Sequence, residues 1–173
     1  MAQDEVGAGD FAYDDTINYM IRRAVNRPTC VLTLPANISV SAAANVGLAY
    51  GAGSEILDDL GWHDTSVNTS RITPTYAGRY MVTANATFAS NATGTRRTMV
   101  FKNAGVTHVW ASTGAVSGSS SNINVTGIIE MNGTTDYVQQ CLYQDSGGAL
   151  NALGTGDSVG TCYLEVTYLG DSL

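Results

Sequence analysis

Charged residues are scarce in this chain of 173 residues, at 13% of the sequence, whereas 44% of its residues are hydrophobic. Lys102 is the single lysine, and the formal net charge is −7. A negative molecule repels nucleic acid and anionic membrane surfaces, which argues against both as partners. No apolar run approaches the roughly 18 residues of a membrane span, and the acidic start lacks the basic and apolar parts of a signal peptide. We expect no membrane insertion, and a protein that stays where it is made or leaves by cell lysis.

Cysteine is also scarce. Cys30, Cys141 and Cys162 have no C-x-x-C spacing, and His63 and His108 lie far from them in the sequence. A zinc site of four clustered ligands is therefore not indicated. We interpret the three cysteines as small buried hydrophobic residues, which is common for free thiols. A bond between Cys141 and Cys162 stays open, because their segments can be neighbours in a sheet.

Only three prolines occur, against nineteen glycines, and Thr, Val and Tyr are frequent. This composition is typical of many strands joined by tight turns. The length fits one domain that buries a core without disulfide bonds.

The clearest pattern lies in residues 71–101. Apolar side chains recur at every second position from Tyr80 to Phe88, which predicts a half-buried strand. Turn-forming residues at 91–94 interrupt the alternation, and a second alternating run follows at 96–101. We expect these two strands to form a β-hairpin.

Shorter alternating or β-rich runs predict further strands. Asn132-Gly133 favours another hairpin turn, the Gly/Ser tract at 114–121 is expected to be a loop, and a helical turn is an option around Ile56, Leu57 and Leu60. The set of eight to ten strands without an interior helix predicts an all-β antiparallel sandwich of jelly-roll type. The additional strands are expected at 29–34, 38–40, 46–50, 71–73, 107–112, 123–131, 137–143 and 162–168.

One helix is predicted, near the N-terminus. An apolar stripe with helical spacing contains Ile17, Met20, Ile21 and Ala24, and Pro28 ends it. A single helix of this length is marginal alone, so its stripe must pack against the sheet, the same helix of other copies or another protein. We therefore divide the chain into a leader with an anchoring helix, residues 1–28, and a sandwich domain, residues 29–173.

No arrangement of residues indicates catalysis. His63, Asp64 and Ser66 are too close in sequence to assemble a triad around an oxyanion hole, and the adjacent acids at 14–15 and 58–59 are expected to point apart. We predict no enzymatic activity and no cofactor. Calcium stays open, because six aspartates fall in predicted loops, although none has EF-hand spacing: Asp58, Asp59, Asp64, Asp136, Asp145 and Asp157.

Several motifs together resemble one family. G-W-H-D-T-S at 61–66, followed by S-R-I-T-P-T-Y-A-G-R-Y-M-V at 70–82, resembles the "(F/W)-x-D … I-x-x-P-x-x-G-x-Y" segment of C1q/TNF-like jelly rolls. D-Y-V at 136–138, Y-Q at 143–144 and Y-L-E-V-T-Y-L-G at 163–170 look like later strands of that family. Residues 88–97 look especially like the C1q-like modules of bacteriophage fibre and decoration proteins. The resemblance covers about residues 29–170, and the chain lacks the collagen-like stalk of vertebrate members.

The resemblance implies a homotrimer in a virion. Tyrosines on the predicted strands suit a subunit interface, with an ordinary core position as the alternative: Tyr80, Tyr137, Tyr143, Tyr163 and Tyr168. The implied function is that of a structural phage protein, a capsid decoration or head-fibre protein whose N-terminal segment binds other virion proteins such as capsid or tail. The alternative is a tail-fibre module in which Trp62 and Trp110 stack on a glycan of the host surface.

Overall fold

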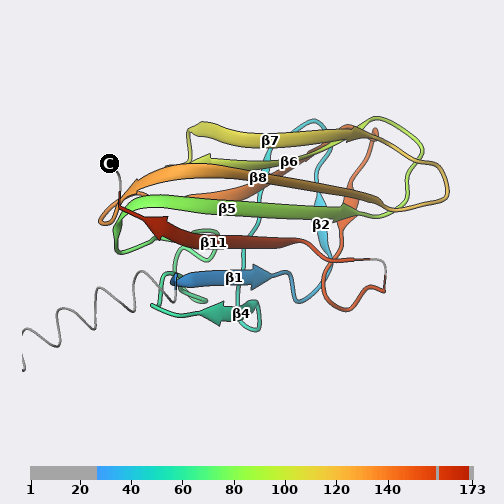
Figure 1. Cartoon of the computed structure of the whole chain (residues 1–173). Helices are drawn as coiled ribbons and strands as arrows, with labels where there is room; N and C mark the ends of the chain where they lie inside the picture. The colour runs from blue at the N-terminus through green and yellow to red at the C-terminus, as the bar shows by residue number, and fades with distance from the viewer. Residues whose placement is uncertain (1–26, 159, 172–173) are drawn as a thin grey trace, which may run out of the picture.

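The computed structural model describes residues 27–158 and 160–171, and every regular element within them is a β-strand. The strands form two antiparallel sheets that pack face to face (Figure 1). The predicted all-β antiparallel sandwich is thereby confirmed. The predicted anchoring helix, with Ile17, Met20, Ile21 and Ala24, lies outside the described residues.

The larger sheet has seven strands, in the order β2-β10-β5-β11-β1-β4, with β8 paired to the other side of β5. The smaller sheet has the order β3-β9-β6-β7. The strands of the larger sheet are β1 (Thr29–Thr33), β2 (Ile38–Val40), β4 (Glu55–Asp58), β5 (Ala77–Phe88), β8 (Ser121–Asn132), β10 (Leu150–Ala152) and β11 (Tyr163–Gly170). Those of the smaller sheet are β3 (Val46–Gly47), β6 (Thr95–Lys102), β7 (Val106–Gly114) and β9 (Val138–Gln144).

Strand β5 is the centre of the larger sheet. It pairs with β8 along its whole length, from Ala77 opposite Asn132 to Phe88 opposite Ser121, and with β11 on its other side. Its inward side chains, at every second position from Tyr80 to Phe88, are fully buried. The alternation that predicts this strand is therefore the alternation that fills the core.

The predicted hairpin between β5 and β6 is wrong. These strands belong to different sheets, and residues 89–94 cross from one sheet to the other (Figure 1). Strand β6 instead forms a hairpin with β7. The alternation at 80–88 and 96–101 does place Phe88 and Arg96 in the same core, but Phe88 enters it from the larger sheet and Arg96 from the smaller one. Periodicity reports which face of a strand is buried, and it leaves the partner strand undetermined.

Asn132-Gly133 also fails to form a hairpin, because β8 and β9 lie in different sheets. The side-chain oxygen of Asn132 accepts hydrogen bonds from the backbone N–H groups of residues 134–136, which folds the crossing into a compact loop. Gly133 has φ 72° and lies against the backbone of Tyr76 and Ala77, so glycine is required there. Two smaller differences are Ile56 and Leu57, which lie in β4 rather than in a helical turn, and β10, which has no distinct sequence signal.

The three cysteines are free and buried, as predicted, and Cys141 and Cys162 are not bonded to each other. Cys141 lies on β9 of the smaller sheet, whereas Cys162 directly precedes β11 of the larger sheet, and its thiol faces the backbone of Thr87. Burial raises the pKa of both thiols to about 11. Buried thiols with a raised pKa hold little thiolate at neutral pH and are chemically inert.

A polar group crosses the core between the sheets. Gln140, on β9, is fully buried, and its amide nitrogen donates to the carbonyl of Asn85 on β5 (2.9 Å) and to the hydroxyl of Thr98 (3.0 Å). Its amide oxygen accepts a hydrogen bond of 2.5 Å from the hydroxyl of Tyr50. This network satisfies the amide on both sides and links the two sheets at a defined register.

Strands β7 and β8 bring the two sheets into contact. Gly127 faces inward on β8, and a Cβ atom at this position would collide with a methyl group of Val109 on β7. The backbone of Gly127 is not in the left-handed region, so the absence of a side chain there serves packing.

We expect Gly127→Ala to lower the free energy of unfolding by about 1–3 kcal/mol, the usual cost of an overpacked core. Gly114→Ala is the matched control, because a Cβ atom at Gly114 meets nothing within 4 Å. Chemical denaturation measures both variants. Val109→Ala in the Gly127→Ala background should recover most of the loss, and strictly additive effects in this double-mutant cycle would contradict the collision.

Candidate functional site

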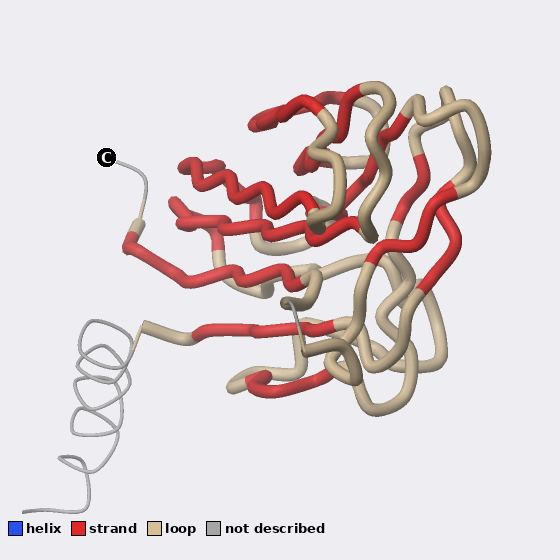
Figure 2. The backbone as a smooth tube through the Cα atoms, turned by 90° about the vertical axis from the view of Figure 1, so that its right-hand side faces the viewer, coloured by secondary structure: helices blue, strands red, loops and turns tan. Residues whose placement is uncertain are grey.

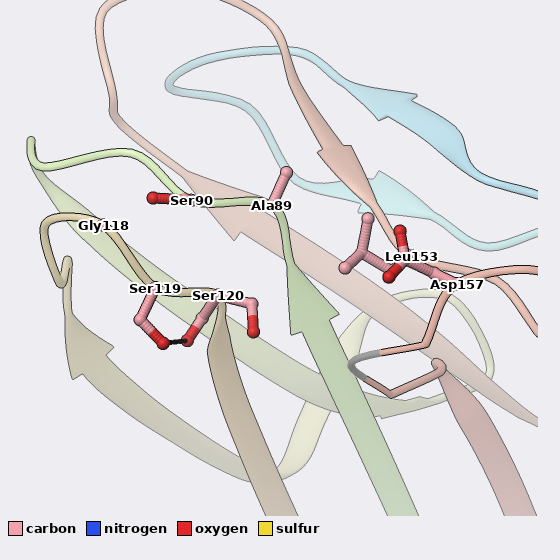
Figure 3. Close-up of a pocket in the computed structure, with 7 residues that line it drawn as sticks. All are labelled: Ala89, Ser90, Gly118, Ser119, Ser120, Leu153 and Asp157. Carbon is pink, nitrogen blue, oxygen red and sulfur yellow. Dashed lines mark hydrogen bonds between the residues drawn. The ribbon is translucent and has the colours of Figure 1, made fainter.

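A cavity of about 370 Å³ opens at one end of the sandwich, where three loops from both sheets converge. At the opposite end of the sandwich, strand β1 begins and strand β11 ends (Figure 1). Figure 2 turns the loop end toward the viewer and shows loops covering much of it. Figure 3 shows the residues that line the cavity: Ala89, Ser90, Gly118, Ser119, Ser120, Leu153 and Asp157.

Backbone hydrogen bonds fix the apolar part of this cavity. The N–H of Ala89 donates to the carbonyl of Asn151 (2.9 Å), and the N–H of Leu153 donates to the carbonyl of Thr87 (2.8 Å). Both bonds continue the pairing of β5 with β10 beyond the strand ends. Gly118 turns the opposite loop with φ 75°, and the Ser119 hydroxyl donates to the carbonyl of Ser120 (3.3 Å).

A second cavity, of about 380 Å³, lies beside residues 61–73 and includes His63 and Asp64. His63 is 7% exposed, and its two ring nitrogens lie 2.9 Å from the carbonyl of Arg71 and 2.7 Å from the carbonyl of Tyr50. Carbonyl oxygens only accept, so each nitrogen makes its bond when it carries a proton. Ser66 donates its hydroxyl to Asp64 rather than to the imidazole (2.7 Å). The side chains of this segment are thus used to hold the loop.

Asp64 illustrates the same local role. Its carboxylate accepts hydrogen bonds from the hydroxyl and backbone N–H of Ser66 and from the N–H of Val67. These bonds lower the pKa of Asp64 to about 2. The neighbouring Asp58 accepts the backbone N–H groups of Trp62 and His63, each at 2.9 Å.

Trp62 is not a surface residue, so its predicted role in stacking on a glycan is wrong. It is 3% exposed, and its ring meets that of Tyr80 edge to face at 5.5 Å between centroids. The indole N–H donates to the hydroxyl of Thr75 (3.2 Å). The W-x-D motif therefore supplies core packing and loop closure.

The predicted interface tyrosines divide into two groups. Tyr80 and Tyr168 are buried within the subunit, in edge-to-face contact at 5.2 Å, so they contribute no area to an interface, and their prediction is wrong. Tyr137, Tyr143 and Tyr163 are half-buried. Arginine side chains lie over two of them, Arg71 over Tyr137 at 4.1 Å and Arg97 over Tyr143 at 4.7 Å. Sequence alternation had not separated the inward tyrosines from the outward ones.

Trp110 is 59% exposed on the outer face of the smaller sheet. It lies on β7 opposite Met99 of β6, which is buried. The indole is accessible, as the glycan hypothesis requires, and that hypothesis stays a prediction.

The outer face of the larger sheet carries an array of Asn, Thr and Tyr side chains that sequence reasoning missed. They bond to one another across the strands: Thr83 to Thr126 at 3.0 Å, Asn122 to Thr87 at 2.7 Å, Asn124 to Tyr163 at 3.0 Å and Thr29 to Thr167 at 3.1 Å. Ile128, 64% exposed, lies on the same face of β8. The sequence signal for this array is the alternation of Asn and Thr residues at 83–87 and 122–126. It indicates hydrogen bonds between strands only when β5 and β8 are known to be neighbours.

In the described part of the chain, no group of three or more His, Cys, Asp or Glu side chains is placed to hold a metal ion such as calcium. These aspartates bond to protein groups: Asp58 and Asp64 as above, Asp59 to the backbone N–H of Thr29, Asp145 to the backbone N–H of Thr95, and Asp136 to the ammonium of Lys102. Calcium stays an open alternative to the expected absence of a cofactor. Among residues 27–158 and 160–171 there is also no helix with the length and hydropathy for crossing a membrane.

Comparisons with known proteins agree on the architecture. No family model matches the chain, and no curated protein matches it in sequence. Solved structures do match. Murine APRIL is 14% identical with a TM-score of 0.57, over 82% of this chain and 99% of that one. Eiger TNF from S. frugiperda is 12% identical with a TM-score of 0.54, over 85% and 96% of the two chains. The globular domain of zebrafish complement 1qA is 11% identical with a TM-score of 0.56, over 84% and 100%.

At these identities the likeness concerns the fold, which is the C1q/TNF-type jelly roll that the sequence resemblance implies. The matches extend over nearly the whole of each solved domain. The described chain is therefore a full jelly roll of this type.

Asp136 generates a testable pH dependence. Its side chain is 11% exposed, and its carboxylate lies 2.7 Å from the Lys102 ammonium and 2.7 Å from the Asn103 amide. Burial acts to raise its pKa, but hydrogen bonds from Asn103, Lys102 and the backbone of Asn132, together with the Lys102 charge, lower the pKa below its usual value of 3.8.

The pKa of Asp136 is lower in the folded state than in the unfolded chain, so the unfolded chain binds more protons in acid. The contribution of Asp136 to the stability of the fold is therefore complete above about pH 4 and is lost below it. Asp136→Asn should lower the free energy of unfolding at pH 7 and flatten its decline as the pH falls below about 4. Denaturation curves at a series of pH values measure this. An unchanged acid slope in the variant would show that Asp136 is not a source of the decline.

Proposed function

We propose that this chain is a non-enzymatic structural protein of a bacteriophage particle, in which three copies associate through the outer face of the larger sheet. The C1q/TNF-type fold often forms trimers. The observation that carries the proposal is the composition of that face, which is mostly uncharged and whose polar side chains already bond to one another.

Internal bonding lowers the cost of covering this face. A polar group that loses water without a new partner costs about 1–3 kcal/mol, whereas the paired hydroxyl and amide groups of this array keep partners when water leaves. Ile128 and Leu57, 64% and 43% exposed, add apolar area to the same sheet. Glu165 is the charged residue near the centre of this face, and it accepts a hydrogen bond from Thr167 (3.3 Å).

The virion setting rests on the resemblance of residues 88–97 to C1q-like modules of phage fibre and decoration proteins. In this proposal residues 1–28 anchor the trimer to capsid or tail, through the apolar stripe Ile17, Met20, Ile21 and Ala24. Strand β1 begins at the end of the sandwich opposite the loop cavity, so an anchor at Pro28 leaves the cavity directed away from the particle (Figure 1). Capsid decoration or a head fibre is the role proposed.

The absence of catalysis is supported by the one trio that resembles catalytic chemistry. Both ring nitrogens of His63 face backbone carbonyls, and Ser66 donates to Asp64. The imidazole thus has no free nitrogen directed at a nucleophile, which a general base needs.

The second candidate function is a receptor-binding module for a host surface glycan. The specific observation in its favour is the exposed indole of Trp110 on the smaller sheet. Aromatic side chains on a sheet face are suited to stacking on sugar rings. This role is compatible with a trimer, since Trp110 and the Asn/Thr array lie on different sheets.

We expect the full chain in solution at micromolar concentration to have three times the chain mass of 18.1 kDa. Thr126→Lys should shift it to the monomer, because the substitution places a charge inside the proposed interface. Thr107→Lys, on the outer face of the smaller sheet, is the matched control and should remain trimeric. Light scattering after gel filtration measures the mass. A stable wild-type monomer would refute the assembly.

Antibody labelling of intact particles tests the virion assignment. Particles of the phage that encodes the chain should bind the antibody, and a chain that lacks residues 1–28 should remain trimeric but fail to join them. Unlabelled particles contradict the assignment, and incorporation of the shortened chain contradicts the anchor alone.

Binding to host cells separates the second candidate from the first. If the chain is a glycan receptor module, labelled trimer binds host cells and Trp110→Ala reduces that binding by about tenfold, the effect of losing roughly 1.4 kcal/mol. Equal binding by both proteins, or none by either, argues against this role.

A further inference from the structure

We infer that the outer face of the smaller sheet binds a sugar that carries a carboxylate, namely a uronic or sialic acid residue of a glycan on the host surface. Trp110 stacks on the ring of this sugar, and Arg97 pairs with its carboxylate. The inference rests on the second candidate function, because it names the class of glycan that such a module recognises. It also adds a residue, Arg97, that discriminates between acidic and neutral sugars.

Arg97 and Trp110 are neighbours on this face. Met99 on β6 lies opposite Trp110 on β7, and Arg97, two residues before Met99, lies opposite Ser112. Residues in this diagonal relation are about 7–8 Å apart, within reach of aromatic and long side chains. Arg97 and Trp110 are both exposed, whereas Met99 is 6% exposed. One ligand can therefore contact the indole and the guanidinium at the same time.

The Arg97 guanidinium is held in place before a ligand arrives. Tyr143 on β9 lies opposite Arg97, and the guanidinium lies over the tyrosine ring, 4.7 Å from its centroid. Stacking covers one face of the guanidinium and leaves the N–H groups at its edge for a carboxylate, which can accept two parallel hydrogen bonds. A side chain that is already ordered loses less freedom on binding.

The smaller sheet differs from the larger one in charge. Its four described strands contain no Asp or Glu. The strands of the larger sheet contain four acidic residues, Glu55, Asp58, Glu130 and Glu165. In a chain with a net charge of −7, an anion therefore meets less repulsion at the smaller sheet than at the larger one.

Arg97 is the permanent cation of this sheet that is available to a ligand. Arg96 is fully buried and donates to backbone carbonyls, and Lys102 pairs with Asp136 at 2.7 Å. Asp145, which follows β9, accepts a backbone N–H of β6. Within residues 27–158 and 160–171, no carboxylate forms an ion pair with Arg97. A ligand carboxylate can thus bind this guanidinium without displacing an acid of the chain.

One guanidinium beside one indole fits a single carboxylate on a ring better than it fits a polyanion. A nucleic acid needs several cations for its successive phosphates, and the net charge of −7 opposes it. A neutral sugar can stack on Trp110 but gains nothing from the charge of Arg97. The acidic sugar is the ligand that uses both side chains.

The test is titration of the ¹⁵N-labelled full chain with glucuronate and N-acetylneuraminate, each compared with its uncharged methyl ester, to about 100 mM. The indole N–H signal of Trp110 reports the site, and that of Trp62, in the core, is the internal reference. We expect at least one acid to shift the Trp110 signal saturably, and to bind about tenfold more tightly than its ester. Added NaCl should weaken binding of the acid only, since salt screens exposed charges.

Three variants make the assignment specific. Arg97→Gln should weaken binding of the acid about tenfold, to the level of the ester, because it removes the charge and leaves the indole. Trp110→Ala should weaken binding of both ligands by a similar factor, which amide signals of β6 and β7 can report. Arg27→Gln is the matched control: it changes the net charge equally, precedes β1, and should bind as the wild type does.

Three results would overturn the inference: equal binding of acid and ester by the wild type, a preference for the acid that survives in Arg97→Gln, or no saturable shift of the Trp110 signal with either acid. Host cells keep this failure separate from that of the second candidate function. If Arg97→Gln binds cells as well as the wild type does, and Trp110→Ala binds them less, the glycan role is supported and the acidic class is refuted. Weaker binding by both variants supports the acidic class.

Discussion

The hydrogen bond from Gln140 to the Asn85 carbonyl is the constraint on which the arrangement of the two sheets depends. Apolar side chains alone let two sheets slide over one another at small cost, because hydrophobic burial has no direction. A buried amide must keep its partners, and Gln140 finds them in Asn85, Thr98 and Tyr50 at a single register. The positions of the sheet ends follow from that register. The loops that meet around the cavity at residues 89–90, 118–120 and 153–157 are therefore placed by a bond near the middle of the core.

The sequence predicts the fold class because alternation is a local property of each strand. Tyr80 to Phe88 and Tyr163 to Gly170 could be recognised from their own residues, and the motifs around Trp62 and Asp136 indicated the jelly roll as a whole. Pairing depends on residues far apart in the chain, so the expected hairpins at 91–94 and 132–133 were both crossings between sheets. In a sandwich, a loop that connects the two sheets joins two strands whose apolar faces bury the same core. Both strands then show the same alternation of apolar and polar residues as the two strands of a hairpin.

The candidate sites were less predictable for the same reason. Trp62 and Trp110 are chemically identical, yet one fills the core against Tyr80 and the other is open to solvent. Trp62 lies in the loop between β4 and β5 with its ring against Tyr80, whereas Trp110 lies on the outer face of β7. The residues next to each tryptophan in the sequence do not indicate this difference. The Asn and Thr array and the loop cavity both consist of small polar residues that carry no motif. Such residues gain a function only when strands or loops from distant segments bring them together.

The direction in which β1 runs has a mechanical consequence. Its first residues lie at the end of the sandwich opposite the loops, and β1 is held between β11 and β4 (Figure 1). A tensile force applied at Pro28, directed away from the loop end, acts along the strand axis. The ladder bonds lie across that axis. They are then strained simultaneously in shear instead of being broken one after another, so β1 resists such a force better than a strand of equal length that is peeled from the sheet edge.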